Sequence, residues 1–346
     1  RSQNPIGGDT RYWSGQDFRI ENLDGRLGSL ESPEDPVIRS LGNVSFDNYL
    51  GASLHIIAAG TVDINSVVIN DVETGVSDEN FLQETVRLSI GNQIIIDGSA
   101  RPTLDIRAGV EPSQVGAPGL TGLGDALFLS SDFVRTTPTT TGTATGTAIT
   151  IGDVVIQPPN GLVLLTNQYN PNPALTSEDI SITGNGFFGL GINATGAGTQ
   201  GSSVFVDSRG DITLPDSANI LACSSRSCLE TAGTGGDITL LANEEVSLGR
   251  RASVLTNREG SIQIHANRLL MERFAQITSL VVGSPDSGSI LVDALEEITI
   301  NGGNLGTFAL PEATGNSGDI EISTKDLTVI GAIEFVGGVL PDGFST

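Results

Sequence analysis

The stretch "GGDITLLANEEVSL", residues 235–248, contains two short apolar runs separated by a polar turn. Apolar and polar residues alternate in each run, which is the period of a β-strand with one buried face. Ile238 and Leu240 lie on the apolar side of the first run, and Val246 and Leu248 on that of the second. Strands this short cannot bury their apolar side alone, so we expect the unit to stack against copies of itself.

The same strand–turn–strand unit recurs along the C-terminal third of the chain. Its first strand begins alike in "GGDITL" (235–240), "GSIQI" (260–264), "GSILV" (288–292) and "GDIEI" (318–322), with "GSSVFV" (201–206) as a fifth copy. The expected inward residues of the first strands are Val204, Ile238, Ile262, Ile290 and Ile320. Those of the second strands are Ile212, Val246, Leu269, Ile298 and Leu327, followed two residues later by Leu214, Leu248, Met271, Ile300 and Val329.

This spacing predicts an all-β fold, a right-handed parallel β-helix with irregular loop excursions. Copies lie roughly 24 to 34 residues apart, which is too short for a four-stranded propeller blade, and a leucine-rich consensus is missing. Equivalent strands of successive coils would then stack as parallel sheets about 4.8 Å apart. We expect about 10 to 12 coils, hence a rod of about 50 to 60 Å.

The N-terminal part also contains short runs of alternating apolar and polar residues, but at less regular intervals. Alternating runs occur at "NVSF" (43–46), "SLHII" (53–57), "TVDI" (61–64), "SVVI" (66–69), "TLDIRA" (103–108), "AITIGDVVI" (148–156) and "GLVLL" (161–165). We therefore divide the chain into an irregular capping segment (1–41), β-helix coils (42–108), a Gly/Thr-rich loop excursion (109–147) and regular coils (148–346). No stretch predicts a helix.

Composition excludes several classes of partner. With 17 basic and 41 acidic residues the formal charge is −24, which repels nucleic acid and anionic membranes. The chain has 44 glycines and only 5% aromatic residues, so its core must be filled by Val, Ile and Leu. Calcium binding in loops such as "SPEDP" (32–36) stays open with no residue assigned, and no other cofactor or catalytic residue is expected.

The two cysteines lie close together in "CSSRSC". A disulfide between Cys223 and Cys228 is compatible with so short a loop. A structural zinc site is disfavoured, because it needs four ligands and the two histidines are distant in sequence. No apolar run reaches the ~18 residues of a membrane span. The chain begins at Arg1 without a signal peptide, so we expect an internal or processed piece of a longer protein.

Two stretches resemble the large filamentous-haemagglutinin-like exoproteins of cyanobacteria, the secreted partners of two-partner secretion systems. They are "FRIENLDGRLGSLESPEDPVIRSLGNVSFDNYLGASLHIIAAGTVDI" (18–64) and "GNSGDIEISTKDLTVIGA" (315–332). The resemblance implies a long right-handed β-helix, exported through an outer-membrane transporter and displayed on the cell. The family's secretion motif, Asn-Pro-Asn before Gly or Leu, is not matched, since "NPN" (170–172) precedes Pro173. The resemblance therefore indicates a passenger region.

Three features could carry chemistry. His55 and His265 have no neighbouring nucleophile in a recognisable pattern, and we expect both at surface or corner positions. The acidic pairs 244–245 and 296–297 could suit a glycosidase, but they recur at the same place in the repeat, whereas an active site is unique. Arg209-Gly210-Asp211 resembles an adhesion signal, yet it leads directly into a strand, so we interpret it as part of the repeat.

The sequence thus predicts a secreted structural or adhesive β-helix segment of a cell-surface or extracellular filament, and no enzyme. Its expected partners are copies of itself in a fibre or coat, cell-surface glycans or proteins, and the transporter during export. The alternative is a carbohydrate-active β-helix enzyme, a polysaccharide lyase or hydrolase. A unique cleft lined by carboxylates and arginines from non-equivalent positions would favour that alternative.

Overall fold

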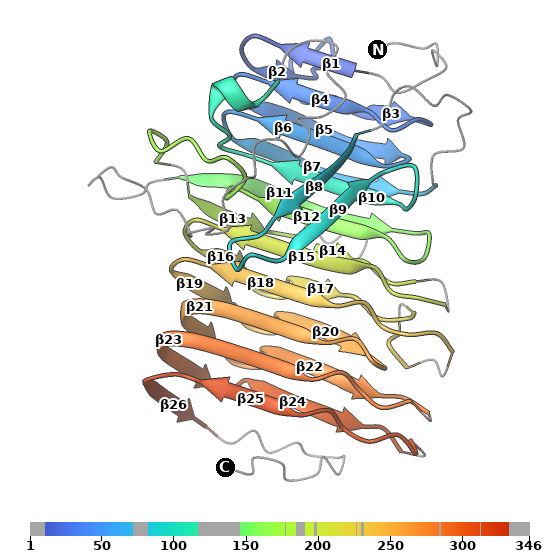
Figure 1. Ribbon diagram of the computed structural model, residues 1–346, viewed down its shortest axis with the longest axis vertical. Helices are drawn as coiled ribbons and strands as arrows, with labels where there is room; N and C mark the ends of the chain where they lie inside the picture. Colours follow the sequence, from blue (N-terminus) through green and yellow to red (C-terminus); the bar gives the residue numbers. More distant parts are fainter. Residues whose placement is uncertain are drawn as a thin grey trace.

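The computed structural model is a parallel β-helix of ten coils stacked along one axis (Figure 1). It describes residues 11–71, 82–116, 146–176, 178–184, 191–196, 199–225, 227–229, 232–283, 285–311 and 313–331. The predicted fold class is therefore confirmed. Among these residues the one helix is a three-residue 3₁₀ turn, η1 (Pro112–Gln114), so no described helix is long enough to span a membrane.

Each coil contributes strands to three parallel faces. The first face consists of β1 (Arg11–Ser14), β4 (Val37–Ser40), β6 (Leu54–Ala58), β10 (Thr103–Arg107), β12 (Leu162–Thr166), β15 (Ser203–Ser208), β18 (Ile238–Ala242), the first halves of β21 (Ile262–Met271) and β23 (Ile290–Asn301), and β25 (Ile320–Ser323). The chain then turns into the second and third faces before the next coil begins.

The second face consists of β2 (Phe18–Arg19), the first halves of β5 (Val44–Gly51), β7 (Val62–Ile69) and β11 (Thr147–Ile156), then β13 (Asp179–Ile182), β16 (Ile212–Leu214), β19 (Glu245–Leu248), the second halves of β21 and β23, and β26 (Asp326–Ile330). The third face consists of β3 (Leu30–Ser32), the second halves of β5, β7 and β11, then β14 (Gly191–Asn193), β17 (Asn219–Leu221), β20 (Ser253–Asn257), β22 (Gln276–Val281) and β24 (Asn304–Ala309).

The register expected from the repeat is confirmed pair by pair. Val204 pairs with Ile238, and Ile262 with Ile290, as the first-strand column requires. The second-strand column is equally in register, and all its inward residues down to the ninth coil are buried. The interior is a single cluster that runs the length of the rod and is filled mainly by Ile, Val, Leu and Ala.

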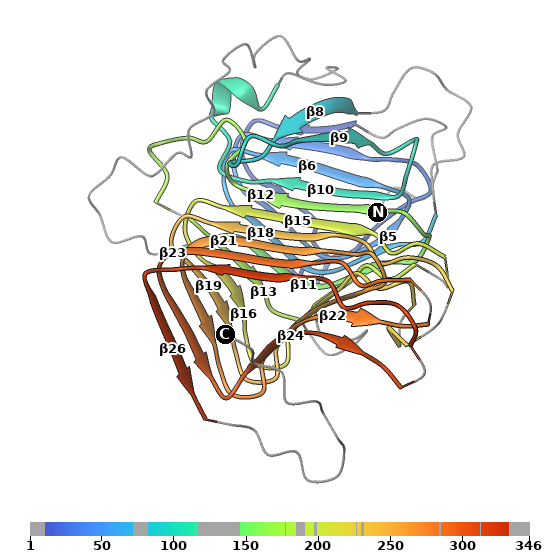
Figure 2. The same cartoon turned by 60° about the horizontal axis from the view of Figure 1, so that its bottom comes forward.

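The N-terminal half of the structure differs from the expected division in two respects. The coils begin within the segment expected to be an irregular cap, because β1, β2, β3 and β4 already pair in parallel. The 42–108 region also contains an antiparallel hairpin, β8 (Gln83–Arg87) and β9 (Gln93–Asp97), which does not join the coils. It crosses the outside of the first face in both views (Figures 1 and 2). Most of the 109–147 excursion, 117–145, lies outside the described residues.

The two ends of the described rod differ in how well they cover the core. At the N-terminal end Tyr12 and Phe18 pack together with ring centroids 5.5 Å apart and lie against the core. At the other end the inward residues Leu327 and Val329 of β26 remain 48% and 51% exposed. Within the described residues no strand pairs with the outer edge of β25 or β26.

Truncation of an inward residue should be far more costly than truncation of its outward neighbour. Leu248→Ala removes a fully buried side chain from β19 and should lower the free energy of unfolding by about 2 to 5 kcal/mol. Ser247→Ala, on the outward side of the same strand, should change it by less than about 0.5 kcal/mol. Urea unfolding of both variants measures this difference, and equal losses would contradict the assigned register.

Candidate functional site

A cluster of charged side chains lies between the first face and the hairpin. Its centre is His55 on β6, which contributes nothing to the surface. The Nε2 of His55 lies 3.1 Å from Asp35 Oδ2, and its Nδ1 lies 3.2 Å from Asp105 Oδ2. Asp105 is its neighbour on β10, because the two residues are register partners on the outward side of the face. The imidazole is thus held between two buried carboxylates.

Arg107 connects this histidine to the hairpin. Its Nε and Nη2 donate to the two oxygens of Asp105 at 2.9 and 2.6 Å, in the fork geometry that guanidinium and carboxylate share. Its Nη1 pairs with Glu84 of β8, and its Cζ lies 4.4 Å from the centre of the Tyr169 ring. Arg107 therefore bonds the coil and the hairpin at once.

Charges balance within the cluster. Arg39, His55 and Arg107 supply three cationic groups, and Asp35, Glu84 and Asp105 supply three carboxylates, all of them buried. Burial alone would lower the pKa of His55, but the charge of Asp35 and hydrogen bonds to both aspartates raise it to about 10. Burial opposes ionisation of Asp105, but the charge of Arg107 and its hydrogen bonds keep the pKa of Asp105 below the ordinary value. The histidine is therefore an imidazolium at neutral pH.

Apolar residues seal the cluster from solvent. Leu82, Val86, Ile94 and Ile96 of the hairpin segment pack on outward residues of the first face such as Leu164. At the hairpin turn, Ser89 donates its N–H and its hydroxyl to Asp207 of β15 at 2.7 and 2.6 Å. The charged groups are buried, and their ion pairs and hydrogen bonds fasten the hairpin to the coils.

The expectation that both histidines occupy surface or corner positions is wrong for His55 and correct for His265. His55 is buried because the hairpin covers the coils on which it lies, and its two carboxylates come from residues 20 and 50 positions away. His265 lies on the uncovered part of the first face, where its side chain is 21% exposed and its Nδ1 is 3.4 Å from Asp293. Its Nε2 lies 2.6 Å from Gln263 Nε2, where His55 has a second carboxylate.

The hairpin could have been found from sequence by its alternation. Leu82, Glu84, Val86 and Leu88 are spaced by two residues and are buried, and Gly91 has a φ of +91° in the turn that follows. Alternating runs that flank such a glycine indicate a hairpin. Nothing local indicated that Glu84 is buried, since that depends on Arg107.

Arg209-Gly210-Asp211 serves the fold. Arg209 is only 1% exposed, and its Nη1 donates to the Asn172 carbonyl oxygen at 3.1 Å. Asp211 Oδ1 accepts the Glu245 N–H of the next coil at 2.9 Å, just as Asp179 accepts that of Asp211. A Cβ on Gly210 would lie 2.4 Å from Asp179 Oδ1, so this ladder requires glycine there. A receptor could not contact the buried arginine.

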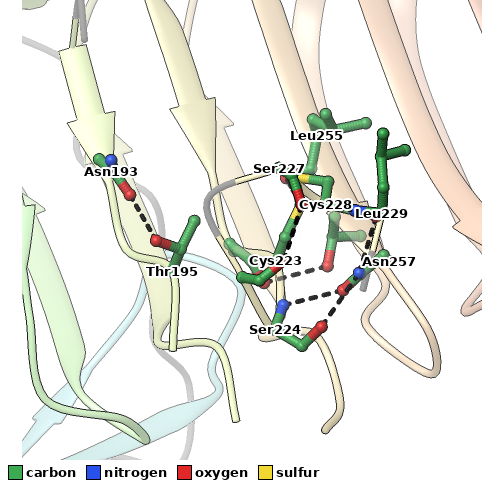
Figure 3. The surroundings of a disulfide bond; sticks show 12 residues. Asn193, Thr195, Cys223, Ser224, Ser227, Cys228, Leu229, Leu255 and Asn257 are labelled. Carbon is green, nitrogen blue, oxygen red and sulfur yellow. Dashed lines mark hydrogen bonds between the residues drawn. A yellow bond between two sulfur atoms is a disulfide. The ribbon is translucent and has the colours of Figure 1, made fainter. Parts of the chain in front are cut away.

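The expected disulfide is present. Cys223 and Cys228 are bonded and both are buried (Figure 3). Asn257 on the neighbouring coil supports the loop, because its Oδ1 accepts the Ser224 N–H and its Nδ2 donates to the Cys228 carbonyl. The bridge therefore closes the loop, and the hydrogen bonds of Asn257 attach it to the next coil. Among the described residues no three His, Cys, Asp or Glu side chains form a group that could hold a metal ion.

The second face carries the most regular surface of the described rod. Its outward residues form a column of mainly hydroxyl side chains, namely Ser181, Thr213, Ser247, Leu270, Thr299 and Thr328. Beside it, at the strand starts, runs the column Asp211, Glu245, Arg268, Glu297 and Asp326. Arg268 Nε lies 3.3 Å from Glu245 Oε2, which reduces the repulsion between stacked carboxylates.

Removal of the Glu84 carboxylate should release the hairpin. Glu84→Ala leaves the buried guanidinium of Arg107 with one carboxylate fewer, and breaking a buried pair in this way costs about 3 to 5 kcal/mol. We expect faster hydrogen exchange in β8 and β9 and a lower free energy of unfolding in urea. Gln83→Ala, an exposed change on the same strand, is the matched control. Equal exchange in the two variants would contradict the role of the cluster.

Stability should fall as the pH rises through the titration of His55. The pKa of about 10 in the folded protein exceeds the ordinary value of 6.5, so the stabilisation is complete below about pH 6.5 and is lost on approach to pH 10. His55→Gln should abolish this slope, whereas His265→Gln should keep it. Urea unfolding between pH 6.5 and 10 measures the slope; a wild type without it would contradict an ionised His55.

The sequence matches no protein-family model, and comparisons with curated proteins and with solved structures gave no match. The resemblance to filamentous-haemagglutinin-like exoproteins thus stays a prediction. The protein is therefore classified by its fold alone, a parallel β-helix. Any function must be inferred from the surface of the rod and from its few non-repetitive contacts.

Proposed function

We propose that this chain is a secreted structural and adhesive β-helix segment of a large cell-surface or extracellular filament protein. It acts through a rigid repetitive surface and exposed loops, and it catalyses no reaction. Its partners are other copies of itself in a fibre or coat, and cell-surface glycans or proteins. Export through an outer-membrane transporter belongs to the same proposal and rests on the family resemblance alone.

The observation that carries the proposal is the periodic outward surface. On the second face, equivalent side chains of five successive coils lie in register as one mainly acidic and one mainly hydroxyl column, interrupted on β21 by Arg268 and Leu270. A binding surface that repeats at every coil suits an extended or multivalent partner. The aperiodic charged cluster around His55 is buried beneath the hairpin and therefore offers no open cleft.

The disulfide supports an extracytoplasmic location. Disulfides persist in oxidising surroundings such as the periplasm and the cell exterior and are rare in the reducing cytosol. The bond between Cys223 and Cys228 closes a short loop that is buried against the next coil. The formal charge of −24 is also suited to a solvated extracellular surface and argues against nucleic acid as a partner.

Immunogold electron microscopy of intact source cells tests the proposal. An antibody against this chain should label the outer surface or filaments that leave it, and antibody absorbed with the purified chain is the control. Labelling confined to the cytoplasm would contradict secretion. Incubation with a panel of acidic and neutral polysaccharides tests the enzymatic alternative in parallel, and cleavage of any of them would contradict a purely structural role.

A further inference from the structure

Three arginines gather at one corner of a strongly acidic protein. Arg250 and Arg251 follow β19, and Arg273 follows the second half of β21, so all three lie where the second face turns into the third. They are exposed, and the Arg251 N–H donates to the Arg273 carbonyl oxygen at 3.2 Å, which places the two coils side by side. We name Arg250, Arg251 and Arg273 the arginine edge.

The arginine edge has no ionic partner within the described residues. Two carboxylates lie at this edge, because Asp216 accepts the Arg250 backbone N–H and Glu272, which precedes Arg273, accepts a hydrogen bond from Asn301. Three guanidinium groups against these two carboxylates leave a net positive edge. In a protein with 41 acidic residues, such an edge is an exception that the fold itself does not use.

At this corner two residues other than glycine adopt the left-handed backbone conformation, which is unfavourable for residues with a side chain. Arg251 and Phe274 have φ values of +61° and +67°, and Gly302, with a φ of +65°, holds the same position on the next coil. A left-handed conformation costs about 1 kcal/mol for a residue other than glycine. The Phe274 ring lies 4.8 Å from Arg273 Cζ and 5.9 Å from Arg251 Cζ, and so orders the two guanidinium groups.

The opposite edge of the same face is acidic. Glu244, Glu245, Glu296 and Glu297 lie at the starts of the neighbouring strands, and we name them the acidic edge. Arg268 lies among them but already pairs with Glu245, so the edge keeps a net negative charge. Between the two edges runs the column of mainly hydroxyl side chains, whose small size leaves the face flat. Figure 2 shows the strands of this face, among them β13, β16, β19 and β26, side by side, and no strand or helix of the described residues covers them.

We propose that the second face binds the second face of another copy of this chain, with the two rods parallel. A two-fold axis parallel to the rod reverses the strand direction but keeps each coil at its own height. It therefore places the arginine edge of each copy against the acidic edge of the other, twice. A two-fold axis along the strands would oppose acid to acid, so the charges select the first arrangement.

The size of the face predicts a weak, repeating contact. Ten coils about 4.8 Å apart and strands about 10 to 15 Å long give roughly 500 to 700 Å² per copy. A stable interface buries roughly 800 Å² per partner, so the described rod should associate weakly and in a salt-sensitive way. The inference rests on the proposed function, since it specifies how copies would lie side by side in a fibre or coat.

Two charge-reversed variants test the pairing. Variant A carries Arg250→Glu and Arg273→Glu, and variant B carries Glu244→Lys and Glu296→Lys, all at exposed positions. In analytical ultracentrifugation at low salt, each variant alone should self-associate roughly tenfold more weakly than the wild type, about 1.4 kcal/mol. An equimolar mixture of A and B should form a one-to-one complex, because both edges are then complementary again.

Unchanged circular dichroism and melting of A and B exclude misfolding as the cause. Failure of the mixture to associate would overturn the pairing. So would self-association of A and of B as strong as that of the wild type. If A alone loses binding to an acidic polysaccharide and the mixture stays monomeric, the arginine edge binds glycans and the inference is wrong. Surface labelling of intact cells is independent of these outcomes, so the pairing can fail while the proposed function stands.

Discussion

Parallel hydrogen bonding between successive coils is the constraint on which the whole structure depends. Because strands of consecutive coils pair in register at about 4.8 Å, every side chain lies directly above its equivalent on the coil before. Inward positions must therefore be filled by residues that stack on themselves, and Ile, Val and Leu do so from Ile38 to Ile300. Outward positions must avoid stacking like charges, which the pairing of Arg268 with Glu245 partly achieves. Acidic residues at the corners also accept backbone N–H groups of the next coil, as Asp179 and Asp211 do.

The hairpin departs from this periodicity, as does the short turn η1, and only part of the rod is covered. Together with Val110, Val115 and Tyr169, the hairpin packs in one cluster with outward residues of the first face from Val37 on β4 to Leu241 on β18; among the described residues this cluster does not reach the last three coils. Six charged groups lie beneath the hairpin with no net charge, an arrangement that is stable only while every partner is present. The covered part of the rod is thus held by contacts between distant segments, whereas each later coil depends on its neighbours.

The proposed function depends on which charged and polar side chains of the rod are exposed to solvent. The repeated columns of the second face and its two oppositely charged edges are accessible, and the charged group that most resembles a catalytic site is not. This distribution supports the proposal that the rod acts by recognition over a long surface. It also explains why Arg-Gly-Asp is misleading, since its arginine is buried and its aspartate belongs to a corner ladder.

The sequence by itself determined the coil. The alternation of Ile238, Leu240, Val246 and Leu248, repeated every 24 to 34 residues, was sufficient for the fold class and for the register, because parallel stacking turns a sequence repeat into a spatial one. Only the tertiary structure decided what happens outside the coil. His55 is buried because residues 82–97 fold back over it, and its ionised state depends on Asp35 and Asp105, which are 20 and 50 residues away. Such contacts do not recur along the sequence, so no local sequence pattern predicts them.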